Sequence, residues 1–314
     1  MGVRPEPAPR FRVLSHVRHD GEVSTDARYE ELAARRGGSA LICGDARQVL
    51  AAFPGESVQT VVTSPPYWSL RNYGVDGQIG LETSVEGFVK ALTRTFDDVR
   101  RVLRKDGTLW LNIGDSYTSG GRTWRAPDRK NPARAMDVRP PTPDGLKPKD
   151  LIGVPWRLAF ALQAAGWYLR ADVIWSKPNA QPESVADRPT RSHEYVFLLS
   201  KSERYLYDVT SVPGPNGRRM RTVWEVNTQA MPEAKGHVAT FPPALVEPCV
   251  LSTSRPGDLV VDPFSGSGTT ALASGLLGRR FVGIELHPAY VNMAQARLER
   301  AGFVALDEDG EDGG

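Results

Sequence analysis

Four consecutive residues, Ser64-Pro65-Pro66-Tyr67, have the chemistry needed to activate an exocyclic amine. The amine of a nucleobase is a weak nucleophile because its lone pair is delocalised into the ring, and two nearby hydrogen-bond acceptors favour a pyramidal nitrogen. The Ser64 hydroxyl and the Pro65 carbonyl can be those acceptors, held rigidly because proline fixes φ and lacks an N–H. Tyr67 offers a flat face on which an extruded base can stack, worth about 1–3 kcal/mol, and Trp68 either extends that stack or packs beneath it. The alternative is a proline turn with no chemical role.

A glycine-rich loop, Asp262-Pro263-Phe264-Ser265-Gly266-Ser267-Gly268, lies near the end of the chain, between an apolar run and a helical pattern. Glycine lets the backbone approach a ligand, and the free N–H groups of the following helix can bind it. Glu285 ends the next predicted strand, where a carboxylate can accept hydrogen bonds from ribose hydroxyls. The pattern predicts a nucleoside cofactor. Its spacing also fits a relaxed NAD fingerprint, so an NAD-dependent oxidoreductase is a remote alternative.

The elements that position these loops alternate between apolar runs and amphipathic helices, which predicts an α/β fold with a doubly wound, mostly parallel, Rossmann-like sheet. Strands are expected at 40–43, 58–62, 108–113, 168–175, 195–199, 258–261 and 280–284. Helices are expected at 88–103, 154–165, 269–277 and 289–300, the first closed by Lys105-Asp106-Gly107. Only one helix follows Glu285, which is too little for an NAD fold. Strands from the earlier half must therefore complete the sheet, and they bring Ser64 beside the cofactor.

The rest of the chain divides into an irregular N-terminal arm (1–38, with one helix near 27–36), a catalytic domain (39–300) and an acidic flexible tail (301–314). Two stretches interrupt the catalytic domain, a basic insert at 118–150 and a short segment at 208–240. The insert combines Trp124 with basic side chains that suit phosphate contacts, although a solvated loop is an equal alternative. These are Arg122, Arg125, Arg129, Lys130, Arg134, Arg139, Lys147 and Lys149.

Composition excludes several classes of protein. The chain of 314 residues has a net charge of +2, so any basic surface must be local. Two cysteines, Cys43 and Cys249, argue against a disulfide scaffold, and no segment has the length and hydropathy of a membrane span or a signal core. His16 and His19 lack companion cysteines, so no metal site is expected. A cytoplasmic protein is the expectation.

Together these motifs resemble the DNA amino-methyltransferases of the permuted β class, familiar from restriction–modification systems, in which the catalytic block precedes the cofactor block. The resemblance runs from about Leu41 to Arg300. It includes further segments in the family's order, namely Ile174-Trp175-Ser176-Lys177-Pro178-Asn179, Asp187-Arg188-Pro189-Thr190, His193-Glu194-Tyr195 and Thr240-Phe241-Pro242-Pro243-Ala244-Leu245.

The resemblance implies a bacterial, archaeal or phage enzyme that flips a base from double-stranded DNA and methylates it with S-adenosyl-L-methionine, beside a cognate restriction endonuclease that acts independently. Catalytic roles fall on Ser64, Pro65, Pro66 and Tyr67. The residues implied in cofactor binding are Asp45, Phe241, Pro242, Asp262, Phe264, Gly266, Gly268, Thr269 and Glu285. The candidate DNA contacts are Trp68, Arg122, Arg125, Lys177, Arg188 and His193. Helix capping is the alternative for Asp45 and Asp262, and a hydrophobic lead into a helix is the alternative for Phe241.

The first residue of the tetrapeptide bears on which base is methylated. Serine there resembles the cytosine-N4 branch of the family, whereas adenine-N6 enzymes usually carry Asp or Asn. N4-methylcytosine is the expected product, and N6-methyladenine is the main alternative. Methylation of an RNA base or a protein amide uses similar loops. Carbon-5 methylation through Pro248-Cys249 is disfavoured because this pair lies in a predicted helix.

Overall fold

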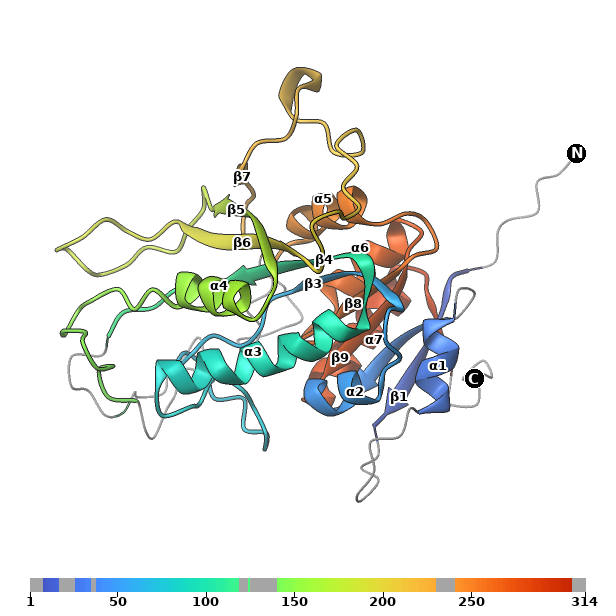
Figure 1. Ribbon diagram of the computed structural model, residues 1–314, viewed down its shortest axis with the longest axis horizontal. Helices are drawn as coiled ribbons and strands as arrows, with labels where there is room; N and C mark the ends of the chain where they lie inside the picture. The colour runs from blue at the N-terminus through green and yellow to red at the C-terminus, as the bar shows by residue number, and fades with distance from the viewer. Residues whose placement is uncertain are drawn as a thin grey trace, which may run out of the picture.

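The structure is a computed structural model that describes residues 8–16, 26–34, 38–118, 124, 140–229 and 241–306. These residues form an α/β fold around a ten-stranded sheet (Figure 1). In chain order the strands are β1 (Arg10–Ser15), β2 (Ser39–Cys43), β3 (Val58–Thr63), β4 (Leu103–Ile113), β5 (Tyr168–Ser176), β6 (His193–Ser200), β7 (Val223–Glu225), β8 (Leu259–Asp262), β9 (Arg280–Glu285) and β10 (Val304–Leu306). Across the sheet they run β10-β1-β2-β9-β8-β3-β4-β6-β5-β7. The doubly wound, mostly parallel sheet that the sequence predicts is confirmed.

Helices cover both faces of the sheet, as Figure 1 shows. They are α1 (Ala27–Ala33), α2 (Ala46–Ala52), α3 (Val85–Val102), α4 (Val154–Ala164), α5 (Pro243–Thr253), α6 (Thr269–Leu276) and α7 (Pro288–Arg300). The buried sides of α1 to α4 share one hydrophobic cluster, whereas α5, α6 and α7 pack into two others. The sheet therefore has one core layer on each face.

The central strands are buried on both faces because successive side chains point to opposite sides. On β3, Val61 packs into the α1 to α4 cluster and Val62 into the α5 cluster. On β4, Leu109 and Leu111 face the first cluster and Trp110 faces the second. Fully buried strands of this kind read as continuous apolar runs in the sequence, which is why their positions could be predicted.

The order of strands brings together loops that are far apart in the chain. The chain passes from β2 through α2 to β3, yet β9 and β8 lie between these two strands in the sheet. All three neighbour pairs, β2 with β9, β9 with β8 and β8 with β3, are parallel. Their carboxyl ends therefore meet at one edge, where ligands bind in open α/β sheets.

Strand β6 is antiparallel to both of its neighbours, so its first residues lie at the same edge of the sheet as the carboxyl ends of the parallel strands. It pairs antiparallel with β4 and with β5, so that Ile113 lies opposite Tyr195 and Trp175 opposite Glu194. The start of β6 therefore lies beside the carboxyl ends of β4 and β5, next to the loop that follows β3.

The predicted irregular arm at 1–38 is wrong in part, because residues 10–15 form strand β1. This strand pairs with both β2 and β10, with Phe11 opposite Ser39 and Ala305. Strand β10 likewise lies within the predicted flexible tail, of which residues 307–314 fall outside the described part of the chain. Both strands are short and their partners are remote in sequence, so local periodicity does not show them.

The turn predicted between α3 and β4 is also wrong. The helix ends at Val102 and the strand begins at Leu103, so that Lys105-Asp106-Gly107 lies within β4. Gly107 is needed there for close packing, since an added Cβ would lie 3.0 Å from the Arg104 carbonyl oxygen and 3.1 Å from that of Gln59. The glycine thus serves strand pairing rather than a helix cap.

Candidate active site

The carboxyl ends of β2, β3, β8 and β9 surround one pocket that both motifs line. From the first motif come Ser64, Pro65, Pro66 and Tyr67, and from the second come Pro263, Phe264 and Gly266. Asp45 and Glu285 complete the wall on the side of β2 and β9. The structure therefore brings together residues that are about 200 positions apart in the chain.

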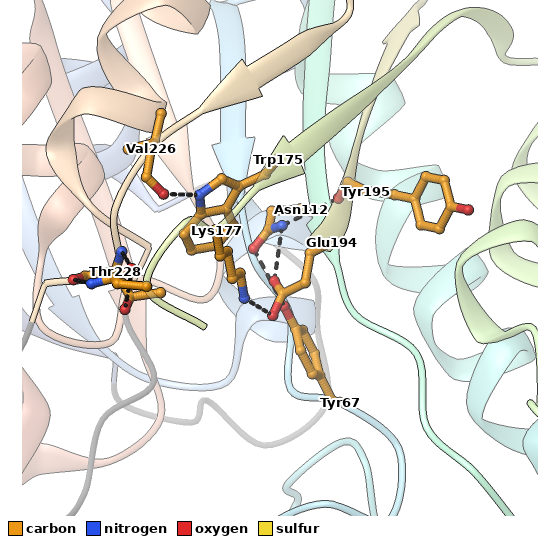
Figure 2. A network of polar contacts seen from close by, with 9 residues as sticks. Tyr67, Asn112, Trp175, Lys177, Glu194, Tyr195, Val226 and Thr228 are labelled. Carbon is orange, nitrogen blue, oxygen red and sulfur yellow. Dashed lines mark hydrogen bonds and ion pairs between the residues drawn. The ribbon is translucent and has the colours of Figure 1, made fainter. Parts of the chain in front are cut away.

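The Tyr67 ring is held at its hydroxyl end by a polar network, shown in Figure 2. Its hydroxyl donates to Glu194 Oε2 at 2.6 Å and lies 3.3 Å from Asn112 Oδ1. Burial, followed by the nearby Glu194 carboxylate, raises the pKa of Tyr67 well above its ordinary value. The phenol is therefore a neutral hydrogen-bond donor and not a base.

The other constraint on Tyr67 is Gly114, at the end of β4. A Cβ added to Gly114 would lie 2.6 Å from Cε2 of the Tyr67 ring and 3.3 Å from Cδ2. No side chain fits in that space, so glycine is required for the ring to lie against the backbone. The ring is thereby fixed between β4 and its hydroxyl partners.

Glu285 holds the glycine loop in place. Its Oε2 accepts from the Gly266 N–H at 2.8 Å, and its Oε1 accepts from the His287 N–H at 2.8 Å. Burial is the largest cause that raises its pKa to about 7, although these backbone hydrogen bonds oppose the shift. Each carboxylate oxygen keeps a second acceptor site, so Glu285 can still receive ribose hydroxyls at the pocket wall.

Asp262 does not line the pocket among the described residues, in contrast to the role the sequence implied. Its carboxylate accepts from the Thr63 hydroxyl at 2.6 Å, the Thr270 hydroxyl at 2.8 Å and the Phe264 N–H at 3.0 Å. The side chain is buried, and that burial raises its pKa to about 6. Asp262 ties the end of β3 to the glycine loop and to α6, which places it behind the site.

Four other residues implied in cofactor binding also lie away from the described pocket wall. Gly268 starts α6 with a φ of 75°, and a Cβ there would meet that of Ala294 at 2.8 Å. The Thr269 hydroxyl is buried and accepts from Arg297 at 2.8 Å. Phe241 is buried in the α5 cluster, and Pro242 directly precedes that helix. Gly268, Thr269 and Phe241 have packing or hydrogen-bond partners within the fold, and the cofactor contacts of all four residues stay a prediction.

The position of Asp45 is compatible with both roles that the sequence left open, helix capping and cofactor binding. It is the N-cap of α2, where its side chain accepts from the Arg47 N–H at 2.9 Å and pairs with the Arg47 guanidinium at 2.5 Å. It also lines the pocket. Its capping role does not remove it from the ligand site.

The loop between β3 and α3 also lines the pocket, and none of the sequence motifs pointed to it. Arg71, Tyr73 and Gln78 from this loop line the pocket, as do His287 and Tyr290 at the start of α7. The Gln78 side chain donates to the Arg71 carbonyl and accepts from the Tyr73 N–H, both at 2.8 Å. Tyr73 meets Tyr290 edge-on with ring centroids 6.0 Å apart. The turn residues Asn72, Gly74 and Asp76-Gly77 are the signal in the sequence that could have indicated this loop.

The candidate DNA contacts have different surroundings in the structure. Trp68 is buried, and its indole N–H donates to the Glu82 carbonyl at 2.9 Å, so it packs beneath the site and cannot extend a stack. Lys177 pairs with Glu194. Arg188 pairs with Glu183 at 2.5 Å and lies over the Tyr117 ring at 3.8 Å. His193 lies edge-on to Tyr195, while Arg122 and Arg125 fall outside the described residues.

Two further expectations concern cysteine and metals. Cys249 is buried within α5, and burial raises the pKa of its thiol well above the ordinary value, which is unsuited to a nucleophile. Among the described residues no group of three or more His, Cys, Asp or Glu side chains is placed to hold a metal ion.

Within that same part of the chain, no helix is long and apolar enough to cross a membrane.

The chain that forms this site matches a known protein family. The model of the N6/N4 DNA methylase family matches residues 58–296, and the chain belongs to that family. It is thus an S-adenosyl-L-methionine-dependent DNA methyltransferase of the type II, restriction–modification kind. The matched region includes the Ser-Pro-Pro-Tyr loop, the glycine loop and Glu285. The NAD-dependent alternative is thereby excluded.

Individual relatives cover most of the chain. The type II methyltransferase M.Cfr9I of Citrobacter freundii is 59% identical over 266 residues, covering 83% of this chain and 88% of that protein. M.SmaI of Serratia marcescens is 58% identical over 266 residues, covering 83% and 90%. A candidate DNA modification methylase of Thermus thermophilus, solved with S-adenosyl-L-methionine, is 28% identical with a TM-score of 0.61, covering 85% and 98%. The cytosine-N4-specific PvuII DNA methyltransferase has the same fold, with 23% identity, a TM-score of 0.62 and coverage of 82% and 85%.

Proposed function

We propose that this enzyme is a permuted β-class methyltransferase that transfers the methyl group to the N4 amine of a cytosine flipped out of double-stranded DNA. The observation that carries the proposal is the shared pocket, in which Ser64 and Tyr67 face the same space as Gly266 and Glu285. A group bound by the glycine loop would be next to the acceptors that can activate an amine. We further propose that it acts beside an independent restriction endonuclease.

The pocket residues fit S-adenosyl-L-methionine. A Cβ at Gly266 would meet nothing within 4 Å, and its N–H group is held by Glu285, so the loop backbone opens onto space suited to a ligand. Glu285 can accept the ribose hydroxyls, and Phe264, Leu286 and Ile79 provide apolar surface for an adenine. When bound, the cofactor supplies an electrophilic methyl group on a sulfonium sulfur.

The catalytic loop would act on the amine by positioning and hydrogen bonding. The Ser64 hydroxyl and the Pro65 carbonyl would accept hydrogen bonds from the two amine N–H groups, which localises the nitrogen lone pair towards the methyl carbon. Tyr67 would stack on the base and offset part of the few kcal/mol that extrusion costs. Orientation of the reacting atoms can lower the barrier by about 7–11 kcal/mol, so no strong base is required. The nitrogen–carbon bond forms as the carbon–sulfur bond breaks, and the amine proton leaves to solvent or through Ser64.

The choice of cytosine rests on Ser64, which occupies the first position of the tetrapeptide as in the cytosine-N4 branch. Adenine carries an equivalent amino group beside a ring nitrogen, so the hydrogen bonds alone do not distinguish the two bases. The basic insert at 118–150 and the segment at 208–240 are proposed to supply the contacts that read the DNA site.

The test is to incubate the protein with DNA and isotope-labelled S-adenosyl-L-methionine and to identify labelled nucleosides by mass spectrometry. We expect labelled N4-methylcytosine. The Ser64→Ala variant should lose transfer while it still binds the cofactor, because it removes one acceptor from the amine and leaves the glycine loop intact. Ser57→Ala, which removes a hydroxyl that donates to the Pro54 carbonyl at 2.8 Å before the amino end of β3, away from the pocket, is the matched control. N6-methyladenine would contradict the choice of base, and full activity of Ser64→Ala would contradict the mechanism.

A further inference from the structure

A charged pair lies behind the hydroxyl end of Tyr67, outside the pocket that binds the cofactor. The Glu194 carboxylate accepts from the Tyr67 hydroxyl at 2.6 Å through Oε2, and its Oε1 pairs with the Lys177 ammonium. The side chains of Lys177 and Glu194 are only 15% and 17% exposed. Neither residue lines the pocket, and the mechanism above does not use them.

The pair is supported by side chains from several strands, as Figure 2 shows. Asn112 of β4 donates to Glu194 Oε2 at 3.2 Å and to the Tyr195 carbonyl at 3.1 Å. The Lys177 ammonium lies 4.1 Å from the centre of the Trp175 ring. The Trp175 indole donates to the Val226 carbonyl at 2.8 Å. The network thus links the loop after β3 with β4, β5, β6 and the segment after β7.

An ion pair that is mostly removed from water is a poor way to gain stability. Removing two charges from water costs several kcal/mol, and apolar side chains of similar volume are often as stabilising. A neutral partner would also be enough to satisfy a buried tyrosine hydroxyl. An ionised acceptor adds a stronger and more directional hydrogen bond. That property matters where the orientation of a ring must be held.

We propose that Glu194 and Lys177 are positioning residues that set the orientation of the Tyr67 ring for stacking on the target base. Gly114 confines the ring on one side, and Glu194 fixes the hydroxyl end. The Lys177 ammonium pairs with Oε1 of Glu194 and lies over the Trp175 ring. This inference rests on the proposed function of Tyr67 as the stacking platform. It assigns Lys177 to the active site and not to a contact with the DNA backbone.

The test is a double-mutant cycle of Tyr67→Phe and Glu194→Gln. The substrate is a DNA fragment that the wild-type protein methylates, and the readouts are the single-turnover rate of methyl transfer, the KM for DNA and the Kd for S-adenosyl-L-methionine. Each single variant should lower the rate about tenfold, because Tyr67→Phe removes the hydrogen bond and Glu194→Gln removes the charge of its acceptor. The double variant should be no slower than about the worse single variant, because both remove the same interaction. The cofactor Kd should not change.

Lys177 is tested by rescue. Lys177→Met should lower the rate about as much as Glu194→Gln, since the carboxylate then loses its cationic partner, and Lys177→Arg should recover part of the rate because a cation is restored. Glu247→Gln makes the same chemical change at an exposed position on α5 and should leave every readout unchanged. If Glu194→Gln does not fold, the cycle of Tyr67→Phe with Lys177→Met measures the same coupling.

Two results would overturn the inference. The first is that the effects of Tyr67→Phe and Glu194→Gln multiply in the double variant, which would make the two residues independent. The second is that Lys177→Met raises only the KM for DNA, which would make Lys177 a DNA contact. Absence of labelled methyl groups in DNA with the wild-type protein would overturn the proposed function instead, so the two failures are distinguishable.

Discussion

The side chain of Tyr67 is constrained both along its ring and at its hydroxyl. Its ring lies against Gly114, directly after β4, and its hydroxyl is bound by Glu194 at the start of β6. Glu285, on the opposite side of the pocket, is similarly constrained because each of its oxygens accepts a backbone hydrogen bond. Single substitutions at these contacts should therefore separate cofactor binding from methyl transfer.

Gly114→Ala should abolish most methyl transfer while cofactor affinity stays near that of the wild type. The added Cβ would lie 2.6 Å from the Tyr67 ring, so the ring must move. Gly38→Ala is the matched control because a Cβ there meets nothing within 4 Å. The measurements are methyl-transfer rate and calorimetric titration with S-adenosyl-L-methionine. Unchanged transfer in Gly114→Ala would show that the position of the ring is not important.

Cofactor affinity should rise about tenfold between pH 6 and pH 8 through ionisation of Glu285. Its pKa of about 7 keeps it mostly protonated at pH 6, and the ionised carboxylate is the stronger acceptor for ribose hydroxyls. Glu285→Gln should flatten this dependence in titrations at pH 6, 7 and 8. A slope retained in that variant would contradict the role of Glu285.

In the cofactor-free protein, the raised pKa of Glu285 makes the contribution of this residue to stability smaller as the pH rises. The folded pKa of Glu285, about 7, lies above its ordinary value of 4.5. The folded state therefore binds more protons between these pH values, and the contribution of Glu285 to stability falls as the pH rises from 4.5 to 7. Glu285→Gln should reduce this fall when the free energy of unfolding is measured by urea denaturation across that range.

Among the helices and strands, the contact that places the two motifs side by side is between the ends of β3 and β8. Each strand delivers one motif, and the Asp262 carboxylate links them through the hydroxyls of Thr63 and Thr270. Thr63 directly precedes Ser64, and Asp262 directly precedes Pro263 of the glycine loop. The distance between the amine acceptors and the cofactor loop thus depends on a buried hydrogen-bonded carboxylate.

Thr63→Val should lower the free energy of unfolding by about 1–3 kcal/mol, because it leaves the buried Asp262 carboxylate without one of its donors. It should also raise the pKa of Asp262 further, since the Thr63 hydrogen bond acts to lower that pKa. Thr93→Val is the control, as its hydroxyl donates to the Val89 carbonyl within α3. Urea denaturation across a pH series measures both effects. Equal losses in the two variants would show that Asp262 does not depend on Thr63.

At the scale of the whole molecule, the two ends of the described chain are joined in the sheet. Strand β1 lies between β10 and β2, so the N-terminal segment connects the end of the chain to the core. Phe11 is 1% exposed and packs near Phe281 with ring centroids 6.0 Å apart. Strand β1 is thus part of the catalytic fold.

Phe11→Ala should cost about 3–5 kcal/mol of stability, the usual loss for a buried phenylalanine. Val223→Ala, at a strand position 59% exposed on the other edge of the sheet, should cost far less. Thermal and urea unfolding give the comparison. A loss in Phe11→Ala no larger than in Val223→Ala would show that β1 is dispensable.

The alternation of elements and the two motifs could be predicted from the sequence for a clear reason. Strands buried on both faces are runs of apolar residues, and the glycine and proline loops have local conformational requirements that few other residues meet. Even the order of the motifs was informative. The order predicts that strands from the earlier half pair with the strand before the glycine loop, and β8 lies beside β3.

Local sequence patterns specify which residue types stand at the carboxyl ends of the strands, and therefore the chemistry available. Which of those side chains face the pocket depends on contacts made in the folded chain. Asp262 and Glu285 both end strands, yet Asp262 is turned inward by Thr63, 199 residues away, while Glu285 stays at the pocket wall. The orientation of a side chain depends on partners from remote segments, and local patterns contain no record of those partners.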